Sequence, residues 1–266
     1  MKLLKNKNVI ITGGNGFLGR HFCEAISEHG GNPIILDVNK KGVEVFLSKL
    51  KKKYHNKPLY LQCDITDLKK VKKFKKIIIS KFKTIHALVN NAAINPKFNK
   101  VDFKSNKKNN LDPSNLKEDF NVSIVGTLNC INVYGPIFAK QKKGSIVNIS
   151  SDLGIISPNH SLYNKSERIE NVKPISYSII KTGIIGITKY ISTYWSKQNV
   201  RCNALAPGGV FESQDKKFVK KISEMVPLNR MAKPKELKEP LIFLLSDNSS
   251  YVNGHTLVAD GGRTIW

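Results

Sequence analysis

The sequence predicts an α/β protein with a doubly wound parallel sheet of about seven strands in a single domain. Short apolar runs alternate with longer segments of helical periodicity along nearly the whole chain. The apolar runs are continuous, as expected for parallel strands that helices cover on both faces. The length of 266 residues fits one large domain, residues 1–266, because no repeat or low-complexity linker divides it.

Seven apolar runs are the expected strands, at residues 8–12, 33–36, 59–63, 85–89, 145–149, 201–205 and 255–259. Helices are expected between and after them, at residues 17–29, 42–54, 67–82, 113–138, 175–197, 215–225 and 235–245. Right-handed crossovers would place these helices on both faces of the sheet. Two polar stretches, near 95–112 and 152–174, interrupt the alternation, and we expect them to be substrate loops.

The charge balance is strongly basic, with 44 Lys and Arg residues against 20 Asp and Glu and a net charge of +24. Only five of the basic residues are arginine, the side chain preferred for bidentate phosphate and base contacts. We therefore expect most lysines to lie on the solvated surface, where they attract anionic small molecules. Specific nucleic-acid binding is not favoured. The sequence shows neither a membrane-spanning apolar run nor a signal-peptide pattern. These features predict a cytoplasmic protein without a membrane partner.

The four cysteines, Cys23, Cys63, Cys130 and Cys202, lie in apolar contexts and form no CxxC pair. Buried free thiols in a reducing compartment are the expected state. No His/Cys cluster has the spacing of a zinc site, so no metal is predicted.

A glycine-rich turn follows the first expected strand and opens the first helix. Glycine permits a tight turn and close approach of a pyrophosphate, while the helix N-terminus supplies unpaired N–H donors. The position between strand and helix makes this pattern specific for a dinucleotide of the Rossmann type. The expected cofactor-binding residues of the turn are Thr12, Gly13, Asn15, Gly16, Phe17, Leu18 and Gly19.

Asp37 ends the second expected strand, about 20 residues after the glycines, where a carboxylate accepts hydrogen bonds from the adenosine ribose. A carboxylate there repels a 2′-phosphate, which favours NAD over NADP. Lys40 and Lys41 follow closely and weaken this preference.

Tyr177 and Lys181 are four residues apart on one expected helix and therefore share a face. A phenol titrates near pH 10, and a neighbouring ammonium lowers its pKa toward neutrality. The pair could therefore donate or accept a proton during a reaction.

Together these features resemble the short-chain dehydrogenase/reductase family over essentially the whole chain. The matching segments are TGGNGFLG (12–19), Asp37, CDI (63–65), NNAA (90–93), DFNV (119–122), IVNISS (146–151), YSIIK (177–181), RCNALAPGG (201–209) and NG…DGG (253–262). A homotetramer or homodimer built on the helices near 113–138 and 175–197 is implied by the same resemblance.

The resemblance implies a catalytic set of Asn121, Ser151, Tyr177 and Lys181. Tyr177 would be the acid/base, Lys181 would lower its pKa and bind the nicotinamide ribose, and Ser151 would hold the substrate oxygen. Asn121 would help to hold a water and proton path. Further cofactor contacts are implied for Asp64, Ile65, Asn91, Ala92, Ala93, Pro207, Gly208 and Val210.

The chain also departs from the family pattern. Ser150 competes with Ser151 for the serine role, and the S-x-x-G pattern favours Ser151. Glu212 stands where the family often has a threonine that holds the carboxamide. Ser151 and Tyr177 are 26 residues apart, about twice the usual spacing of the family. The inserted stretch is polar. Together with the segments TGGNGFLG (12–19) and PGG (207–209), this insertion looks like that of oxidoreductases of flagellin-modification and surface-sugar loci.

We therefore expect a NAD(H)-dependent oxidoreductase that interconverts a secondary alcohol and a ketone on a polar or anionic, sugar-type substrate. One alternative is a 3-oxoacyl thioester reductase that uses NADPH, against which Asp37 and the polar insertion argue. Another is a non-catalytic dinucleotide- or RNA-binding module, which would not require Asn121, Ser151, Tyr177 and Lys181 together.

Overall fold

The computed structural model describes residues 2–94, 99–100, 116–163 and 171–266. Seven parallel strands form one sheet in the order β3-β2-β1-β4-β6-β8-β9. They are β1 (Asn8–Thr12), β2 (Asn32–Asp37), β3 (Leu59–Gln62), β4 (Ala87–Asn90), β6 (Gly144–Ile149), β8 (Val200–Pro207) and β9 (Thr256–Ala259). The predicted fold class, a doubly wound parallel sheet in one domain, is confirmed.

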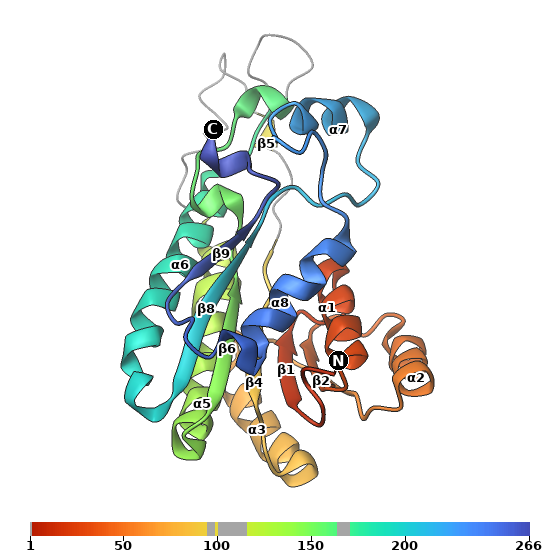
Figure 1. Cartoon of the computed structure of the whole chain (residues 1–266), viewed down its shortest axis with the longest axis vertical. Helices are drawn as coiled ribbons and strands as arrows, with labels where there is room; N and C mark the ends of the chain where they lie inside the picture. The colour runs from red at the N-terminus through yellow and green to blue at the C-terminus, as the bar shows by residue number, and fades with distance from the viewer. Residues whose placement is uncertain (1, 95–98, 101–115, 164–170) are drawn as a thin grey trace.

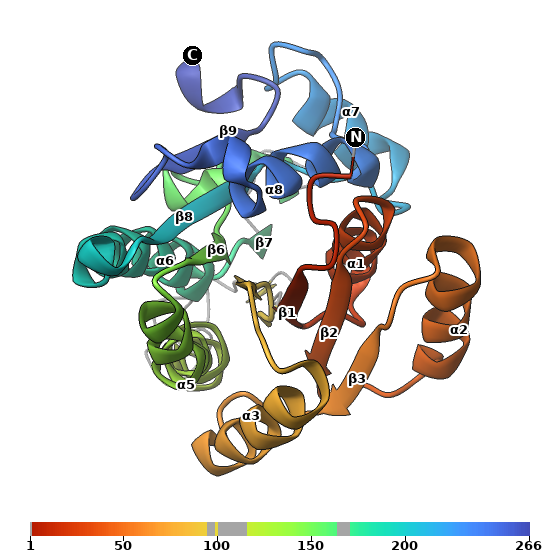
Figure 2. The ribbon, with the colours of Figure 1, turned by 60° about the horizontal axis from the view of Figure 1, so that its bottom comes forward.

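The helices lie on both faces of this sheet (Figures 1 and 2). They are α1 (Phe17–Glu28), α2 (Val43–Tyr54), α3 (Leu68–Phe82), α4 (Leu116–Phe120), α5 (Gly126–Gln141), α6 (Ile175–Tyr194), α7 (Lys216–Ser223) and α8 (Lys238–Leu245). Helix starts follow local chemistry where a capping side chain is present. Asp67 and Asp215 accept hydrogen bonds from the first-turn N–H groups of α3 and α7.

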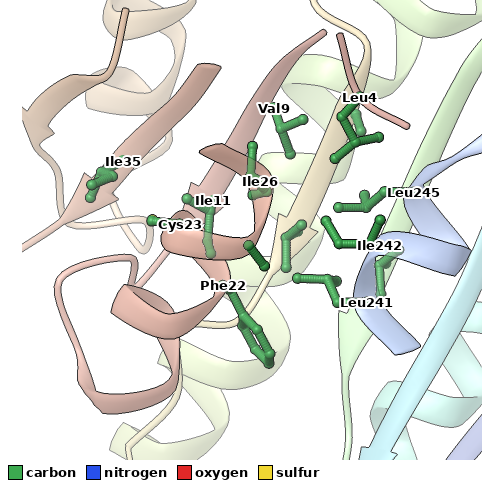
Figure 3. Packing of buried hydrophobic residues seen from close by; sticks show 14 of the residues in the cluster. Leu4, Val9, Ile11, Phe22, Cys23, Ile26, Ile35, Leu241, Ile242 and Leu245 are labelled. Atoms are coloured by element: carbon green, nitrogen blue, oxygen red, sulfur yellow. The ribbon is translucent and has the colours of Figure 1, made fainter. Parts of the chain in front are cut away.

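Each face of the sheet carries its own apolar core. Val9 and Ile11 of β1 pack with α1, α2 and α8, whereas Ile10 packs on the other face with α3 and α5. Successive side chains of a strand point to opposite faces, which explains why the strands read as continuous apolar runs. Figure 3 shows the first core, where Phe22 and Ile26 of α1 lie near Leu241 of α8. All four cysteines are buried free thiols, as expected.

One predicted helix, 113–138, differs in its interior. Residues Asn121–Val125 form a π-helix between α4 and α5, and residues 113–115 lie outside the described part of the chain. With α4 and α5 it makes an apolar segment long enough to cross a membrane, yet 56% of the most apolar window is buried inside the protein. A sheet-covering helix explains this burial.

The two expected loops contact each other through a short two-stranded ladder. Asn99–Lys100 (β5) pairs antiparallel with Asn171–Val172 (β7). The second stretch also contains two 3₁₀ turns, η3 (Asp152–Gly154) and η4 (His160–Tyr163). Residues 95–98, 101–115 and 164–170 lie outside the described part of the chain.

Strand order reverses between β1 and β4, so the segments that follow these two strands diverge. Ligands bind at such a switch point, beyond the carboxyl ends of the strands. The glycine turn, Asp37, Asn91, Ser151 and Pro207 all stand at or directly after these ends.

Candidate active site

The ends of β1 and β4 are joined by hydrogen bonds and by close contact between their backbones. Gly13 has φ +62°, and a Cβ there would lie 2.8 Å from the Cα of Ala92. The Thr12 hydroxyl oxygen accepts hydrogen bonds from the backbone N–H groups of Asn91 (3.1 Å) and Ala92 (3.0 Å). The Asn91 amide donates to the carbonyl oxygens of Thr12 and Gly13. Thr12 and Gly13 are therefore held against Asn91 and Ala92 by these hydrogen bonds and by close backbone contact.

The N-terminus of α1 fits the phosphates of a dinucleotide. Its N-cap residue is Gly16, which offers no side chain, and the first turn contains no acidic residue. The free N–H groups and the positive end of the helix dipole therefore face outward. A Cβ on Gly19 would overlap the carbonyl oxygen of Gly13, so this position requires glycine. Leu18 packs against the core instead.

Asp37 is 8% exposed at the end of β2. Its two oxygens accept hydrogen bonds from the backbone N–H groups of Asn15 (2.9 Å) and Asn39 (2.8 Å). A carboxylate has about four acceptor positions, so acceptor capacity remains for ribose hydroxyls. The residues at this turn thus fit a nicotinamide dinucleotide.

Arg20 is a cation near Asp37 that the sequence reasoning missed. Its guanidinium donates to the Asn15 side chain (2.8 Å) and to the Lys41 carbonyl oxygen (3.2 Å). It therefore links α1 to the loop that carries Lys40 and Lys41. Its position directly after Gly19, the last glycine of the turn, could have identified Arg20 from the sequence.

The remaining predicted adenine contacts differ in exposure. Asp64 is exposed, and its carboxylate accepts hydrogen bonds from the Thr66 N–H (2.9 Å) and hydroxyl (2.7 Å). Ile65 is buried against Gly126 of α5, while Ala93 is exposed after β4.

Ser151, Tyr177 and Lys181 are brought together by β6 and α6. Lys181 is the one buried lysine among the described residues, and its Nζ donates to the carbonyl oxygen of Ile149 (3.0 Å). The same Nζ lies 5.7 Å from the centre of the Tyr177 ring. The Ser150 hydroxyl donates to the Lys181 carbonyl oxygen (2.7 Å), which supports Ser151 as the residue that faces the reaction.

Burial governs the titration of these groups. It raises the pKa of Tyr177, against a hydrogen bond with Ser151 that lowers it, and Asp152 raises it further. Burial also lowers the pKa of Lys181 to about 8, and the neighbouring charge of Lys173 adds to this shift. In the protein alone, burial thus outweighs the lowering of the Tyr177 pKa that we expected from Lys181.

Lys173 is a second ammonium at the same phenol. Its Nζ lies 4.1 Å from the centre of the Tyr177 ring. Burial lowers the pKa of Lys173 to about 8, while Asp119 of α4 raises it. The sequence assigns Lys173 no separate role, because it is one of several polar residues of the insertion. Its spacing of four residues before Tyr177 matches that of Lys181 after it and could have identified it.

Asn121 is exposed, beside Leu116, Lys117 and Phe120. The buried polar side chain of this π-helix is Ser123, whose hydroxyl has no hydrogen-bond partner in the described structure. The structure therefore does not bring Asn121 to Tyr177 by any hydrogen bond between described residues, and its catalytic role stays a prediction.

The end of β8 contributes the last predicted residues. Pro207 is buried, and the Gly208 N–H donates to the Ala259 carbonyl oxygen (3.0 Å). A Cβ on Gly208 would lie 2.8 Å from the Cα of Asp260, so the β8 and β9 ends approach closely. Val210 forms a bridge with Ala232, and Glu212 is exposed.

Known proteins are similar to this chain over nearly its full length. The family described as "Enoyl-(Acyl carrier protein) reductase" matches residues 16–264. The post-translational flagellin modification protein A of Campylobacter coli is 27% identical over 98% of this chain and 99% of its own. The 3-oxoacyl-(acyl-carrier-protein) reductase FabG of Thermotoga maritima is 29% identical over 98% and 99%.

A solved structure shares the fold and the family. The NAD⁺-bound short-chain dehydrogenase from Leptospira borgpetersenii superposes with a TM-score of 0.83 at 28% identity, covering 98% of this chain and 94% of that one. The fold, the residues at the strand ends and the match over nearly the full length lead to one assignment. This chain belongs to the short-chain dehydrogenase/reductase family, as a single-domain oxidoreductase that acts on CH–OH groups.

Proposed function

We propose that the protein is a NAD(H)-dependent oxidoreductase that interconverts a secondary alcohol and a ketone on a polar, sugar-type substrate. The observation that carries the proposal is the grouping of Ser151, Tyr177 and Lys181 at the strand ends, on the same edge as the glycine turn and Asp37.

In the oxidation direction, Tyr177 accepts the hydroxyl proton of the substrate through its phenolic oxygen. Lys181, held by the Ile149 carbonyl oxygen, stabilises the phenolate with its positive charge. Ser151 bonds the substrate oxygen and orients it toward Tyr177. The nicotinamide supplies the hydride acceptor, and the chain supplies position and proton transfer. In reduction the same proton moves back from Tyr177.

NAD specificity is proposed from Asp37, whose buried carboxylate keeps acceptor capacity for ribose hydroxyls and repels a 2′-phosphate. The polar substrate is proposed from Lys173 and Tyr163, which the insertion brings toward Tyr177. The likeness to a flagellin modification protein supports a role in carbohydrate biosynthesis.

A 3-oxoacyl thioester reductase that uses NADPH is the second candidate. It is favoured by the family description, by the Thermotoga maritima relative and by Arg20, a cation beside the ribose-binding turn. A non-catalytic binding module is disfavoured because it would not require Ser151, Tyr177 and Lys181 to lie together.

Assembly and location are further proposals. Ile179, Tyr190 and Tyr194 expose apolar surface along α6, and a Cβ on Gly186 between them would meet open space. This face suits a second copy of the chain, in a homodimer or homotetramer. Its proposed site of action is the cytoplasm, as the sequence indicates.

The decisive assay measures reduction of NAD⁺ and NADP⁺ against sugar phosphates, nucleotide sugars and hydroxyacyl thioesters. Turnover of a sugar with NAD⁺ supports the proposal, whereas turnover of thioesters with NADP⁺ replaces it by the second candidate. Tyr177→Phe should lower kcat by roughly 10²–10⁴-fold, the usual contribution of acid/base catalysis, and leave NAD⁺ affinity unchanged. Tyr190→Phe on the same helix is the matched control. Full activity of Tyr177→Phe would contradict the mechanism.

A further inference from the structure

A buried ion pair lies directly behind the reactive serine. Arg263, in the 3₁₀ turn η8 (Arg263–Ile265) near the C-terminus, donates through Nη1 to Asp152 Oδ2 at 2.6 Å. The two side chains are 5% and 3% exposed. The other oxygen of Asp152, Oδ1, accepts a hydrogen bond from the Ser151 hydroxyl at 2.7 Å. The chain of contacts therefore runs from the C-terminal turn to the serine.

These contacts use most of the hydrogen-bonding capacity of the Ser151 hydroxyl. It has one proton and two acceptor positions. Its proton is donated to Asp152, and its oxygen accepts a hydrogen bond from the Leu153 N–H at 3.2 Å. One acceptor position remains, which can receive the phenol proton of Tyr177 or a substrate hydroxyl. To donate to a ketone oxygen, Ser151 must turn its proton away from Asp152.

The charge on Asp152 thus decides how firmly the serine proton is held. An ionised carboxylate accepts hydrogen bonds and cannot donate one, so it fixes the direction of the Ser151 O–H bond. Arg263 balances the negative charge of this carboxylate and occupies part of its acceptor capacity through a charge-assisted hydrogen bond. Within the described residues, Asp152 is the one ion-pair partner of Arg263.

We propose that Asp152 and Arg263 are positioning residues: the buried ion pair sets the direction and availability of the Ser151 proton for the reaction at Tyr177. The proposal rests on the proposed function, in which Ser151 and Tyr177 hold the reacting oxygen. It assigns a catalytic purpose to a C-terminal turn that lies 111 residues away from Asp152 in sequence.

The charged and titratable groups around Asp152 come from several elements. Arg263 approaches from η8, Tyr163 from η4 and Tyr177 from α6. Burial raises the pKa of Tyr163 to about 12, and Arg263 lowers it while Asp152 raises it. The guanidinium of Arg263 bonds directly to one oxygen of the carboxylate, and the Ser151 hydroxyl and the Leu153 N–H donate to the other oxygen.

The test compares Arg263→Met, Arg263→Lys and Asp152→Asn in the full-length enzyme. For Arg263→Met we expect kcat to fall at least tenfold with unchanged NAD⁺ affinity. A buried carboxylate without its counter-ion has a raised pKa, so kcat should gain a new ionisation between about pH 5 and 8. Asp152→Asn should also lower kcat, without that ionisation, and Arg263→Lys should recover part of the rate. Arg230→Met, which breaks the exposed ion pair with Glu236, is the control.

A double variant keeps the test decisive if removal of one partner unfolds the protein. Asp152→Leu with Arg263→Met replaces the pair by apolar side chains, an exchange that buried ion pairs often tolerate. We expect a folded protein with at least tenfold lower kcat, because Ser151 loses its acceptor. A wild-type kcat in this variant, or a wild-type pH profile in folded Arg263→Met, overturns the proposal. If Tyr177→Phe stays active, the proposed function fails instead.

Discussion

Removing the ammonium of Lys173 should move the pH profile of the enzyme to higher pH. The Nζ atoms of Lys173 and Lys181 lie 4.1 and 5.7 Å from the centre of the Tyr177 ring, so they are at most about 10 Å apart. At an effective dielectric constant of about 20, two unit charges at 10 Å repel by roughly 1.7 kcal/mol, or about 1.2 pKa units.

The sign follows from the charge that is removed. A positive neighbour lowers the pKa of an ammonium and of a phenol alike, so its removal raises both. For Lys173→Met, we therefore expect both limbs of the kcat/KM profile for alcohol oxidation to move upward by about one unit. The alkaline limb starts near the pKa of about 8 of Lys181.

The assay is steady-state oxidation between about pH 6 and 10 at constant ionic strength. Lys173→Arg keeps the charge and should keep the profile. Lys189→Met removes an exposed charge from the same helix, two turns beyond Lys181, and should shift neither limb. A Lys173→Met profile that is unshifted, or shifted to lower pH, would refute the electrostatic role of Lys173.

Three further outcomes are expected. Gly13→Ala should destabilise the protein by roughly 1–2 kcal/mol or more, because φ is +62° and the new Cβ would meet Ala92; thermal unfolding measures this, and an unchanged midpoint would contradict it. Asp37→Ser should raise kcat/KM for NADP⁺ relative to NAD⁺ by an order of magnitude, because the carboxylate no longer repels the 2′-phosphate; an unchanged ratio would remove Asp37 from cofactor selection. Tyr190→Lys should lower the oligomeric mass seen by light scattering, since it adds charge to the exposed α6 face; an unchanged mass would place the interface elsewhere.

The sheet was predictable because each strand is short, apolar and bounded by polar or turn residues. The expected strand at residues 8–12 coincides with β1, and the others agree to within two residues at each end. A fully buried parallel strand can be recognised from its apolar composition alone, so its prediction does not require knowledge of distant contacts.

The site was predictable where function requires a fixed local motif. Gly13 and Asp37 are examples. The glycine of a left-handed turn and a carboxylate at a strand end can both be recognised from the few residues around them in the sequence. The π-helix at Asn121–Val125 was missed, because apolar spacing near 3.6 does not reveal one inserted residue. The Asp152–Arg263 pair was missed for a different reason: its partners are far apart in the chain, and only folding brings them together.

The short ladder between β5 and β7 has a consequence for how such an enzyme changes its specificity. It ties the two long connections to each other directly before Lys173. Substitutions within Asn99–Lys100 and Asn171–Val172 would therefore act on the substrate side of the enzyme, while the core that α5 forms with β1, β2 and β4 keeps its packing.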